Sequence, residues 1–578
     1  MAITLANFSS YSPDIKFSFT NTEYDLSEYQ DKLASRRDEN SLFLRRVGHA
    51  GTKKSTNKFY GSNLGTDIDS LTTNKMYFIQ SLDSHDSQQI VALYSNFPNI
   101  KNNCLPILAS DEQIIGSLIN AFISLDDLTF EAKTVLLDIL ISIVEISSEK
   151  VTEKLIDELS LTISLVAQNS LEEMSTNDML ENGCENSKLL PLILKLIQTF
   201  TAKSLYSRSA MISFGILDSL ILIASKNVND DLTNQCLLSI RSIFSKNVTK
   251  SNNLNYNPLF ISGTASSSSD QGMKVRRIRS TRSAPNSISL NQLCGLNNNG
   301  DPSSEMDFEI DINDVDKIID PLFDLLHIKS NQNENYATIN IILNIFVELT
   351  NMLPILIKRF YEKGLFQYSL NTLAIPELMK PSLNLIGNLP IYNSISFIQN
   401  MIENGLFPRL MQLIQNIDHT SIVFWILSNY LEAAPQFIIP LIDINLINLS
   451  VGIGEQSSFH VKREIAYFLS TLIIFINNES AIKSLFNERT IDLIAEMLNS
   501  GVENLMIRCI FAFQKILGLA VQSGSIDFNA DAVLQMFDNS DVVKQLDEIV
   551  QQIDQNNTTL ISIASKLLYD IHSLTNNQ

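Results

Sequence analysis

A chain of 578 residues is too long for one compact hydrophobic core, and its composition shows no division into ordinary globular domains. A hydrophobic content of 45% with only 19 Gly and 15 Pro favours a mostly helical protein. The net charge of −21 argues against nucleic acid as a partner and for basic peptides, although acidity alone also keeps a large helical protein soluble. The cysteines form no CxxC pair and no secretory leader is apparent, so a reduced intracellular compartment is expected (Cys104, Cys184, Cys236, Cys294 and Cys509).

Two short segments are basic in this acidic chain. Residues 32–58 hold eight Lys or Arg against two acids, and residues 274–283 hold five basic residues and no acid. The first segment contains SRRDENSLFLRRV, in which Arg pairs flank an acidic and then an apolar patch. This pattern is typical of an amphipathic helix that folds on binding. A solubilising N-terminal tail is the alternative interpretation.

Apolar helical patterns begin near residue 83 and become clear over residues 188–247, with a turn at Gly215. Residues 248–312 break the pattern, because they are rich in Ser and Asn and have no helical period, which predicts a disordered insertion. Helical patterns resume at Val315 and continue to the end. The longest apolar run, around Ile465–Ile476, is too short to span a bilayer and is predicted to be a buried helix.

The stretch from residue 381 to residue 477 repeats itself with a period of about forty residues. A turn residue followed by Leu opens one apolar helix of each unit, at Gly364-Leu365, Gly405-Leu406 and Asn445-Leu446. Gly and Asn tolerate the left-handed backbone that a sharp turn between helices needs. A second apolar helix follows and carries Asn388, Asn429 or Thr471 at the matching place. This period predicts an armadillo or HEAT solenoid, in which each repeat buries its apolar face on its neighbours.

Short sequence motifs in these helices are similar to those of one protein family. IGN at Ile386–Asn388, WILSN at Trp425–Asn429 and VKRE at Val461–Glu464 resemble successive armadillo repeats of importin α, the adaptor for basic nuclear-localisation signals. The resemblance implies an all-α, right-handed armadillo-repeat superhelix with a disordered N-terminal arm and one long disordered insertion. The implied parts are a basic arm that binds importin β (1–60), degenerate N-terminal repeats (61–247), the insertion (248–312), C-terminal repeats (313–520) and an acidic capping repeat (521–578).

In that family a Trp, and an Asn one turn later, face outward into a concave groove that binds the basic cargo peptide. Spacing i, i+4 places two side chains on one helix face, as for Trp425 and Asn429. The amide bonds the peptide backbone, and the indole stacks on a Lys or Arg stem. The resemblance implies peptide contacts for Asn388, Trp425 and Asn429, with Tyr467 as a poorer stacking wall.

The match is incomplete, because the chain has one Trp, Thr471 lacks an amide, and the early repeats contain no recognisable equivalent of the major peptide site. Trp425 as a core aromatic, and Asn388 as a helix-end residue before Pro390, are the alternative interpretations.

The resemblance gives the N-terminal basic segment a role, and the residues of the insertion suggest one for the second. The arm is expected to contact importin β through four arginines, and a thin match to an autoinhibitory cluster follows them (Arg36, Arg37, Arg45, Arg46, Lys53 and Lys54). In the insertion, KVRRIRSTRS reads as a nuclear-localisation signal that would compete with cargo until its serines are phosphorylated (Lys274, Arg276, Arg277, Arg279, Ser280 and Ser283). A neutral spacer is the alternative for the insertion.

No catalytic pattern stands out. The six His are dispersed, no His or Cys has metal-ligand spacing, and Gly452-Ile453-Gly454 lacks the strand–turn–helix context of a phosphate loop. The sequence therefore predicts a non-enzyme without a metal or cofactor. The expected function is nuclear import by a protein that shuttles between cytoplasm and nucleus, with importin β, basic cargo peptides and a nuclear export receptor as partners and neither nucleic acid nor membrane. The alternative is an armadillo scaffold without a transport role.

Overall fold

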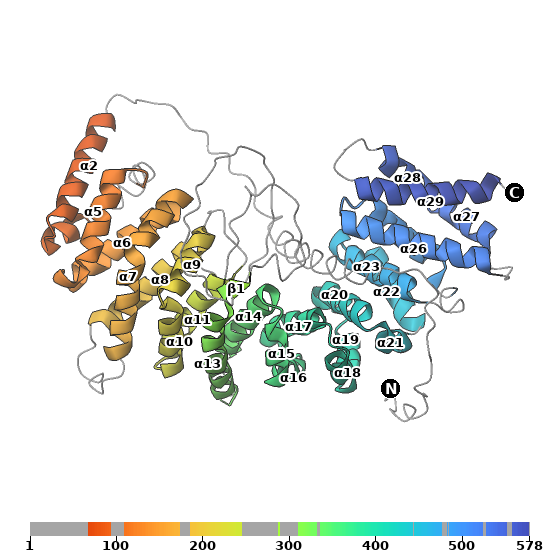
Figure 1. Cartoon of the computed structure of the whole chain (residues 1–578), viewed down its shortest axis with the longest axis horizontal. Coiled ribbons are helices and arrows are strands. Elements are labelled where there is room, and N and C mark those ends of the chain that lie inside the picture. Colours follow the sequence, from red (N-terminus) through yellow and green to blue (C-terminus); the bar gives the residue numbers. More distant parts are fainter. Residues whose placement is uncertain are drawn as a thin grey trace.

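The protein is a row of helices bent into an arc (Figure 1). The structure is a computed structural model, and it describes residues 67–93, 109–173, 185–245, 287–288, 310–331, 336–414, 416–442, 444–476, 483, 485–523, 528–551 and 558–576. The expected all-α armadillo architecture is confirmed over these residues. The predicted N-terminal arm lies outside them, as does nearly all of the predicted insertion.

The first part of the arc is less regular than the rest. Its helices are α2 (Asp67–Asp83), α5 (Glu112–Ile123), η2 (Leu125–Asp127), α6 (Phe130–Ile146), α7 (Glu149–Glu173) and α8 (Glu185–Lys203). The first complete three-helix unit follows, with α9 (Leu205–Ser213), α10 (Ile216–Lys226) and α11 (Asp230–Phe244).

The later units follow one another with little change. The first is α13 (Ile312–Ser330) with α14 (Tyr336–Met352), and the second is α15 (Leu356–Glu362), α16 (Leu365–Thr372) and α17 (Pro376–Asn388) with η4 (Leu389–Tyr392). The third is α18 (Ile395–Glu403), α19 (Leu406–Leu413) and α20 (Ile417–Ala433), and the fourth is α21 (Pro435–Ile438) with η5 (Ile439–Leu441), α22 (Ile444–Gln456) and α23 (Phe459–Phe475). The last two are α25 (Glu488–Ala495) with η6 (Glu496–Asn499) and α26 (Glu503–Gln522), and α27 (Ala530–Asn539), α28 (Val542–Gln551) and α29 (Thr558–Asn576).

The predicted turns between the first and second helix of a unit are confirmed at three glycines. Gly215, Gly364 and Gly405 have φ of 72°, 80° and 88°, in the left-handed region where a Cβ is unfavourable. The prediction is wrong at Asn445, because α22 already begins at Ile444 and Asn445 lies in its first turn. The short helices α21 and η5 end just before it, at Ile438 and Leu441.

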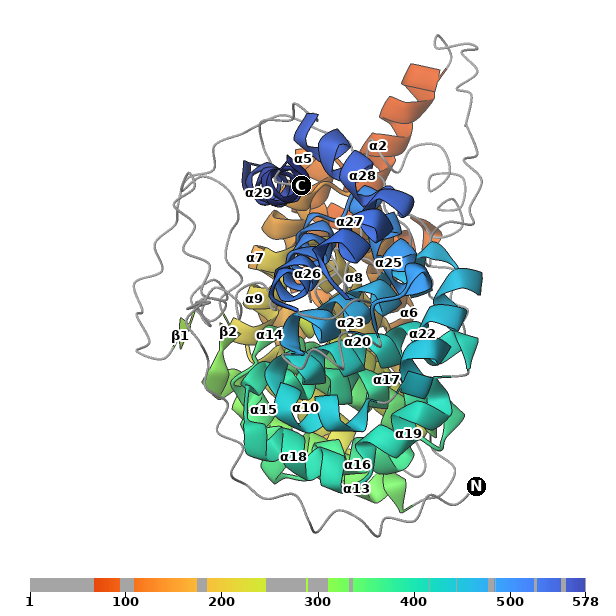
Figure 2. The same cartoon turned by 90° about the vertical axis from the view of Figure 1, so that its right-hand side faces the viewer.

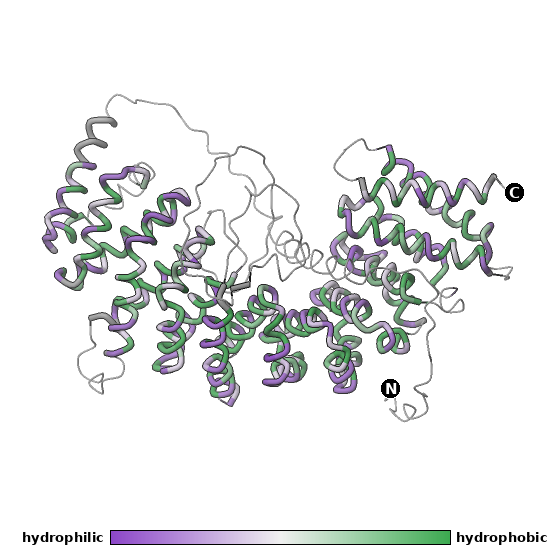
Figure 3. The backbone as a smooth tube through the Cα atoms, in the orientation of Figure 1, coloured by the Kyte–Doolittle hydropathy of each residue, from purple (hydrophilic) through white to green (hydrophobic). Residues whose placement is uncertain are grey.

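The last helix of each unit packs on the last helix of the next, in the order α8, α11, α14, α17, α20, α23, α26 and α29. These inner helices line the inside of the bend, and the shorter helices such as α16 and α18 lie outside it (Figure 1). Seen along the arc, α22 and α25 lie to one side of α23 and α26 (Figure 2). Apolar residues occur in nearly every helix (Figure 3), and the buried ones form one continuous core from Phe78 to Ile571.

One small exception to the helical architecture is present. Strand β1 (Ser287–Ile288), within the predicted insertion, pairs antiparallel with β2 (Ile310–Asp311), just before α13. The sequence predicted neither strand, because two-residue strands have no detectable period.

One described helix, α26, is long and apolar enough to cross a membrane, and two bent helix pairs pass the same test if each is one span. In the structure α26 packs between α23 and α29, so its apolar face is used within the solenoid. The apolar run around Ile465–Ile476 is likewise a buried helix, as predicted, since it forms the second half of α23.

Candidate functional site

The contact between α17 and α20 is built around the single tryptophan. Asn416 caps the start of α20 through its side-chain oxygen, which accepts from the backbone N–H of Asp418. Two turns further along, the six-membered ring of Trp425 lies against Gly387 of α17. A Cβ at Gly387 would lie only 1.9 Å from Cζ3 of that ring. Glycine is therefore needed at residue 387 for the two inner helices to approach this closely.

The end of α17 is held by side chains of α20. Pro390 has no N–H, so the carbonyl of Ile386 lacks the usual donor one turn later. The Tyr430 hydroxyl donates to that carbonyl over 3.2 Å, and Nδ2 of Asn429 donates to the carbonyl of Gly387 over 3.1 Å. Burial raises the pKa of Tyr430 well above its ordinary value, which keeps the hydroxyl a donor.

A similar polar contact joins other pairs of inner helices. Asn388 donates from Nδ2 to the Thr350 hydroxyl of α14 over 2.9 Å. The Thr350 hydroxyl in turn donates a hydrogen bond to the carbonyl of Val347. Between α8 and α11 the hydroxyls of Thr201 and Ser242 lie 2.7 Å apart. Asn388, Asn429 and Ser242 therefore each join two neighbouring inner helices.

This arrangement corrects the expected exposure of the predicted peptide contacts. Trp425 is 8% exposed, Tyr467 6%, Asn388 3% and Asn429 1%. They do lie on consecutive inner helices, α17, α20 and α23, but their side chains are buried. Phe424, Ile426 and Leu427 are buried together with Trp425, so the alternative interpretation of Trp425 as a core aromatic fits its burial.

Two polar atoms on α20 remain without a hydrogen-bond partner within the described residues. Nε1 of Trp425 and Oδ1 of Asn429 are both buried, and they lie one turn apart on the same helix face. Nε1 lies on the indole edge opposite the one that contacts Gly387, so it faces away from α17. An unpaired buried donor or acceptor costs about 1–3 kcal/mol, so such a pair in a native structure requires an explanation.

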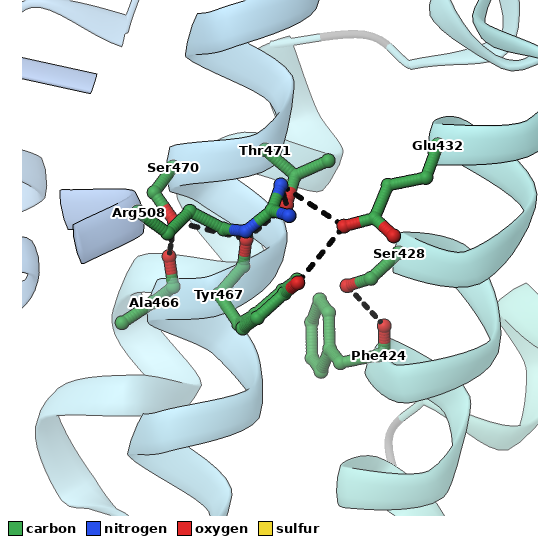
Figure 4. Close-up of polar contacts among 8 residues, drawn as sticks. All are labelled: Phe424, Ser428, Glu432, Ala466, Tyr467, Ser470, Thr471 and Arg508. Atoms are coloured by element: carbon green, nitrogen blue, oxygen red, sulfur yellow. Dashed lines mark hydrogen bonds and ion pairs between the residues drawn. The ribbon is translucent and has the colours of Figure 1, made fainter. Parts of the chain in front are cut away.

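A second group of polar side chains lies further along the row of inner helices, across α20, α23 and α26 (Figure 4). The Arg508 guanidinium stacks over the Tyr467 ring, with its carbon 4.3 Å from the ring centroid. Its Nη1 lies 2.9 Å from Oε1 of Glu432 and donates to the Thr471 hydroxyl over 3.1 Å. The Tyr467 hydroxyl donates to the same Glu432 oxygen over 3.0 Å. We call these four residues the arginine cluster.

The sequence did not predict two members of this cluster. Arg508 of α26 is the residue that lies against Tyr467. The spacing contained the signal, because Tyr467 follows Trp425 by 42 residues and Arg508 follows Tyr467 by 41. Glu432 carried no such signal, since it lies in the last turn of α20, outside the Trp-and-Asn pattern.

The remaining predicted site residues lie outside the described part of the chain. These are the arm residues Arg36, Arg37, Arg45, Arg46, Lys53 and Lys54, and the insertion residues Lys274, Arg276, Arg277, Arg279, Ser280 and Ser283. Their roles stay predictions. Within the described ranges no group of three His, Cys, Asp or Glu side chains is placed to hold a metal ion.

The close approach of Gly387 to Trp425 gives a first testable prediction. Gly387→Ala places a methyl group inside the indole, so we expect the free energy of unfolding to fall by about 1–3 kcal/mol. Gly518→Ala is the matched control, because Gly518 is exposed in mid-helix α26 with nothing near its missing Cβ. That variant is expected to gain about 0.5–1 kcal/mol from helix propensity. Urea denaturation followed by circular dichroism measures both, and equal effects would contradict the contact.

Comparison with solved structures gives the same architecture. The crystal structure of an engineered protein aligns with 86% of this chain and 99% of its own, at 12% identity and a TM-score of 0.51. A designed armadillo repeat protein in complex with the peptide (KR)4 aligns with 43% of this chain and 98% of its own, at 15% identity and a TM-score of 0.33. No protein-family model and no curated protein matches the sequence. The likeness establishes the fold, and the three-helix units with inner helices in register make it an armadillo-repeat solenoid.

Proposed function

We propose that this protein is an interaction scaffold that binds an extended basic peptide in its groove, centred on α20. The observation that carries the proposal is the unpaired couple of the Trp425 indole N–H and the Asn429 amide oxygen. An extended peptide offers one carbonyl acceptor and one N–H donor per residue, which is what this couple lacks. Binding would convert two unpaired buried groups into hydrogen-bonded ones, so the couple favours a bound main chain over the empty groove.

Access to the couple requires movement, because both atoms are buried. Asn429 holds α17 through its amide nitrogen only, so its oxygen becomes accessible without loss of that bond if a neighbouring side chain moves aside. We therefore expect peptide binding to rearrange side chains around Trp425 and to leave the backbone of α17 and α20 in place.

Charge selects the kind of peptide. The chain has a net charge of −21. Among the buried glutamates of the inner helices, Glu432 on α20 and Glu464 on α23 already pair with Arg508 and Arg463, so the attraction rests mainly on the net charge of the chain. Basic peptides would therefore be attracted at low ionic strength and released by salt.

Affinity for a labelled (KR)4 peptide tests the proposal, with (ES)4 as the acidic control. Asn429→Ala removes the amide oxygen and is expected to weaken binding by about five- to tenfold, the value of one hydrogen bond. Asn404→Ala is the matched control, since Asn404 is exposed at the end of α18 and bonds only within that helix. Equal affinities of the two variants would reject α20 as the binding site.

A transport role is the finer form of the proposal. The support is the resemblance of the arm and repeats to importin α, which implies importin β and an export receptor as partners and shuttling between cytoplasm and nucleus. Pull-down of importin β by the full chain tests the arm, and neutralising Arg36, Arg37, Arg45 and Arg46 together should abolish it. Unchanged binding of importin β by that variant would reject the assignment of the four arginines. Failure of the unchanged chain to bind importin β would leave a scaffold without a transport role.

A further inference from the structure

The arginine cluster has the chemistry of a binding site for an arginine side chain. Such a site needs an aromatic face for the flat guanidinium, a carboxylate for its charge and a further acceptor for its N–H groups. Tyr467, Glu432 and Thr471 supply these from two consecutive inner helices, α20 and α23. The occupant, Arg508, comes from the third, α26.

Hydrogen bonds that do not involve Arg508 orient Tyr467, Glu432 and Thr471. The Thr471 hydroxyl donates to the carbonyl of Tyr467 over 2.7 Å, so its oxygen is free to accept from a guanidinium. The Tyr467 hydroxyl donates to Glu432, which fixes both the ring and the carboxylate. The Glu432 side chain is fully buried and that of Arg508 is 9% exposed, so the site is desolvated and its contacts are strong.

The position of Arg508 links the cluster to the peptide groove. Trp425, Tyr467 and Arg508 recur at intervals of 42 and 41 residues on α20, α23 and α26. Arg508 therefore occupies the place of an aromatic wall in its own unit and bends back over the wall of the preceding one. A peptide lying along the groove would meet this side chain immediately beyond Trp425.

We propose that Tyr467, Glu432 and Thr471 form an arginine site that the chain fills with its own Arg508. On the proposed function, this internal occupant closes the groove at α23, so a bound peptide places its basic side chains over α17 and α20 and none over Tyr467. Arg508 would thus be a specificity-determining residue, and its removal would open one further position for an arginine of the ligand.

Rescue of Arg508→Ala by ethylguanidinium tests the site without any peptide. The full-length variant has a site of the right size with its carboxylate retained. We expect its Tm to rise by about 1–2 °C at an ethylguanidinium concentration ten times the dissociation constant, relative to the same concentration of NaCl. The unchanged protein and the double variant Arg508→Ala with Glu432→Gln should show no such rise. Absence of the rise in Arg508→Ala, or an equal rise in all three proteins, would overturn the proposal.

Affinity for (KR)4 then separates this proposal from the proposed function. Arg508→Ala should bind the peptide about tenfold more tightly than the unchanged protein, by gaining one buried guanidinium contact. Arg508→Gln, whose amide still donates to Glu432, keeps the fold if the alanine variant does not and should bind with an intermediate gain. Rescue by ethylguanidinium without peptide binding by any protein would reject the proposed function and retain the arginine site. If Arg508→Ala and Arg508→Gln bind the peptide with the affinity of the unchanged protein, Arg508 does not restrict peptide binding.

Discussion

Glu432→Ala is expected to lower the free energy of unfolding by about 3–5 kcal/mol. Glu432 is the common acceptor of Arg508 and Tyr467, and its side chain is fully buried. Its loss removes the negative charge that offsets the desolvation of a guanidinium held between α20, α23 and α26. Because each repeat contacts only its neighbours, the loss should be concentrated in these three helices. Urea denaturation gives the size, and amide hydrogen exchange locates it.

The matched control is Glu455→Ala. Glu455 also pairs with an arginine, Arg489, but both side chains are well exposed. Water screens an exposed pair and replaces its hydrogen bonds, so stability should remain nearly unchanged. A small effect of Glu432→Ala, similar to that of the control, would mean that the arginine cluster does not hold the inner helices together.

Trp425→Ala should cost a similar amount, about 3–5 kcal/mol, because it leaves a large cavity between α17 and α20. The double variant with Gly387→Ala makes this prediction specific. In the unchanged protein the added methyl group at residue 387 collides with the indole, whereas in the alanine background it enters the cavity. Gly387→Ala should therefore destabilise the first background and stabilise the second, which a double-mutant cycle measures as a favourable coupling.

Phe366→Ala serves as the comparison for the cavity alone. Phe366 is fully buried in α16, whereas the atoms nearest to a Cβ at Gly387 all belong to Trp425. Its combination with Gly387→Ala should be additive. Additivity of Trp425→Ala with Gly387→Ala as well would contradict the packing of the indole on Gly387.

The solenoid was predictable because its determinants are local and repeated. Gly364 and Gly405 mark sharp turns because these turns need a left-handed backbone, which glycine adopts readily. The apolar helices between them then give a repeat of about forty residues, which is the period of an armadillo solenoid. The same criterion failed at Asn445, which is a helical residue and not a turn residue. Asparagine tolerates the left-handed region without needing it, and Asn445 lies in the first turn of α22 instead.

The site was less predictable, because exposure depends on how closely two inner helices approach. The i, i+4 pattern correctly placed Trp425 and Asn429 on one face. It contained no information that Gly387 lets α17 come close enough to bury the indole. Arg508 was missed for a related reason. Its interaction partners lie 37 and 76 residues earlier in the chain, and a charged residue within an apolar helix is usually interpreted from its own helix alone.

The most direct test of peptide binding at α20 uses the only tryptophan of the chain. Labelling with ¹⁵N-tryptophan gives a single indole N–H cross-peak, which reports on Nε1 of Trp425. Titration with (KR)4 should move this peak downfield as the unpaired N–H acquires an acceptor. The dissociation constant from this titration should equal the one measured by fluorescence anisotropy of the labelled peptide. In Asn429→Ala the movement should require about five- to tenfold more peptide. A peak that stays in place while the peptide saturates the protein, or a peptide that does not bind, would contradict the account.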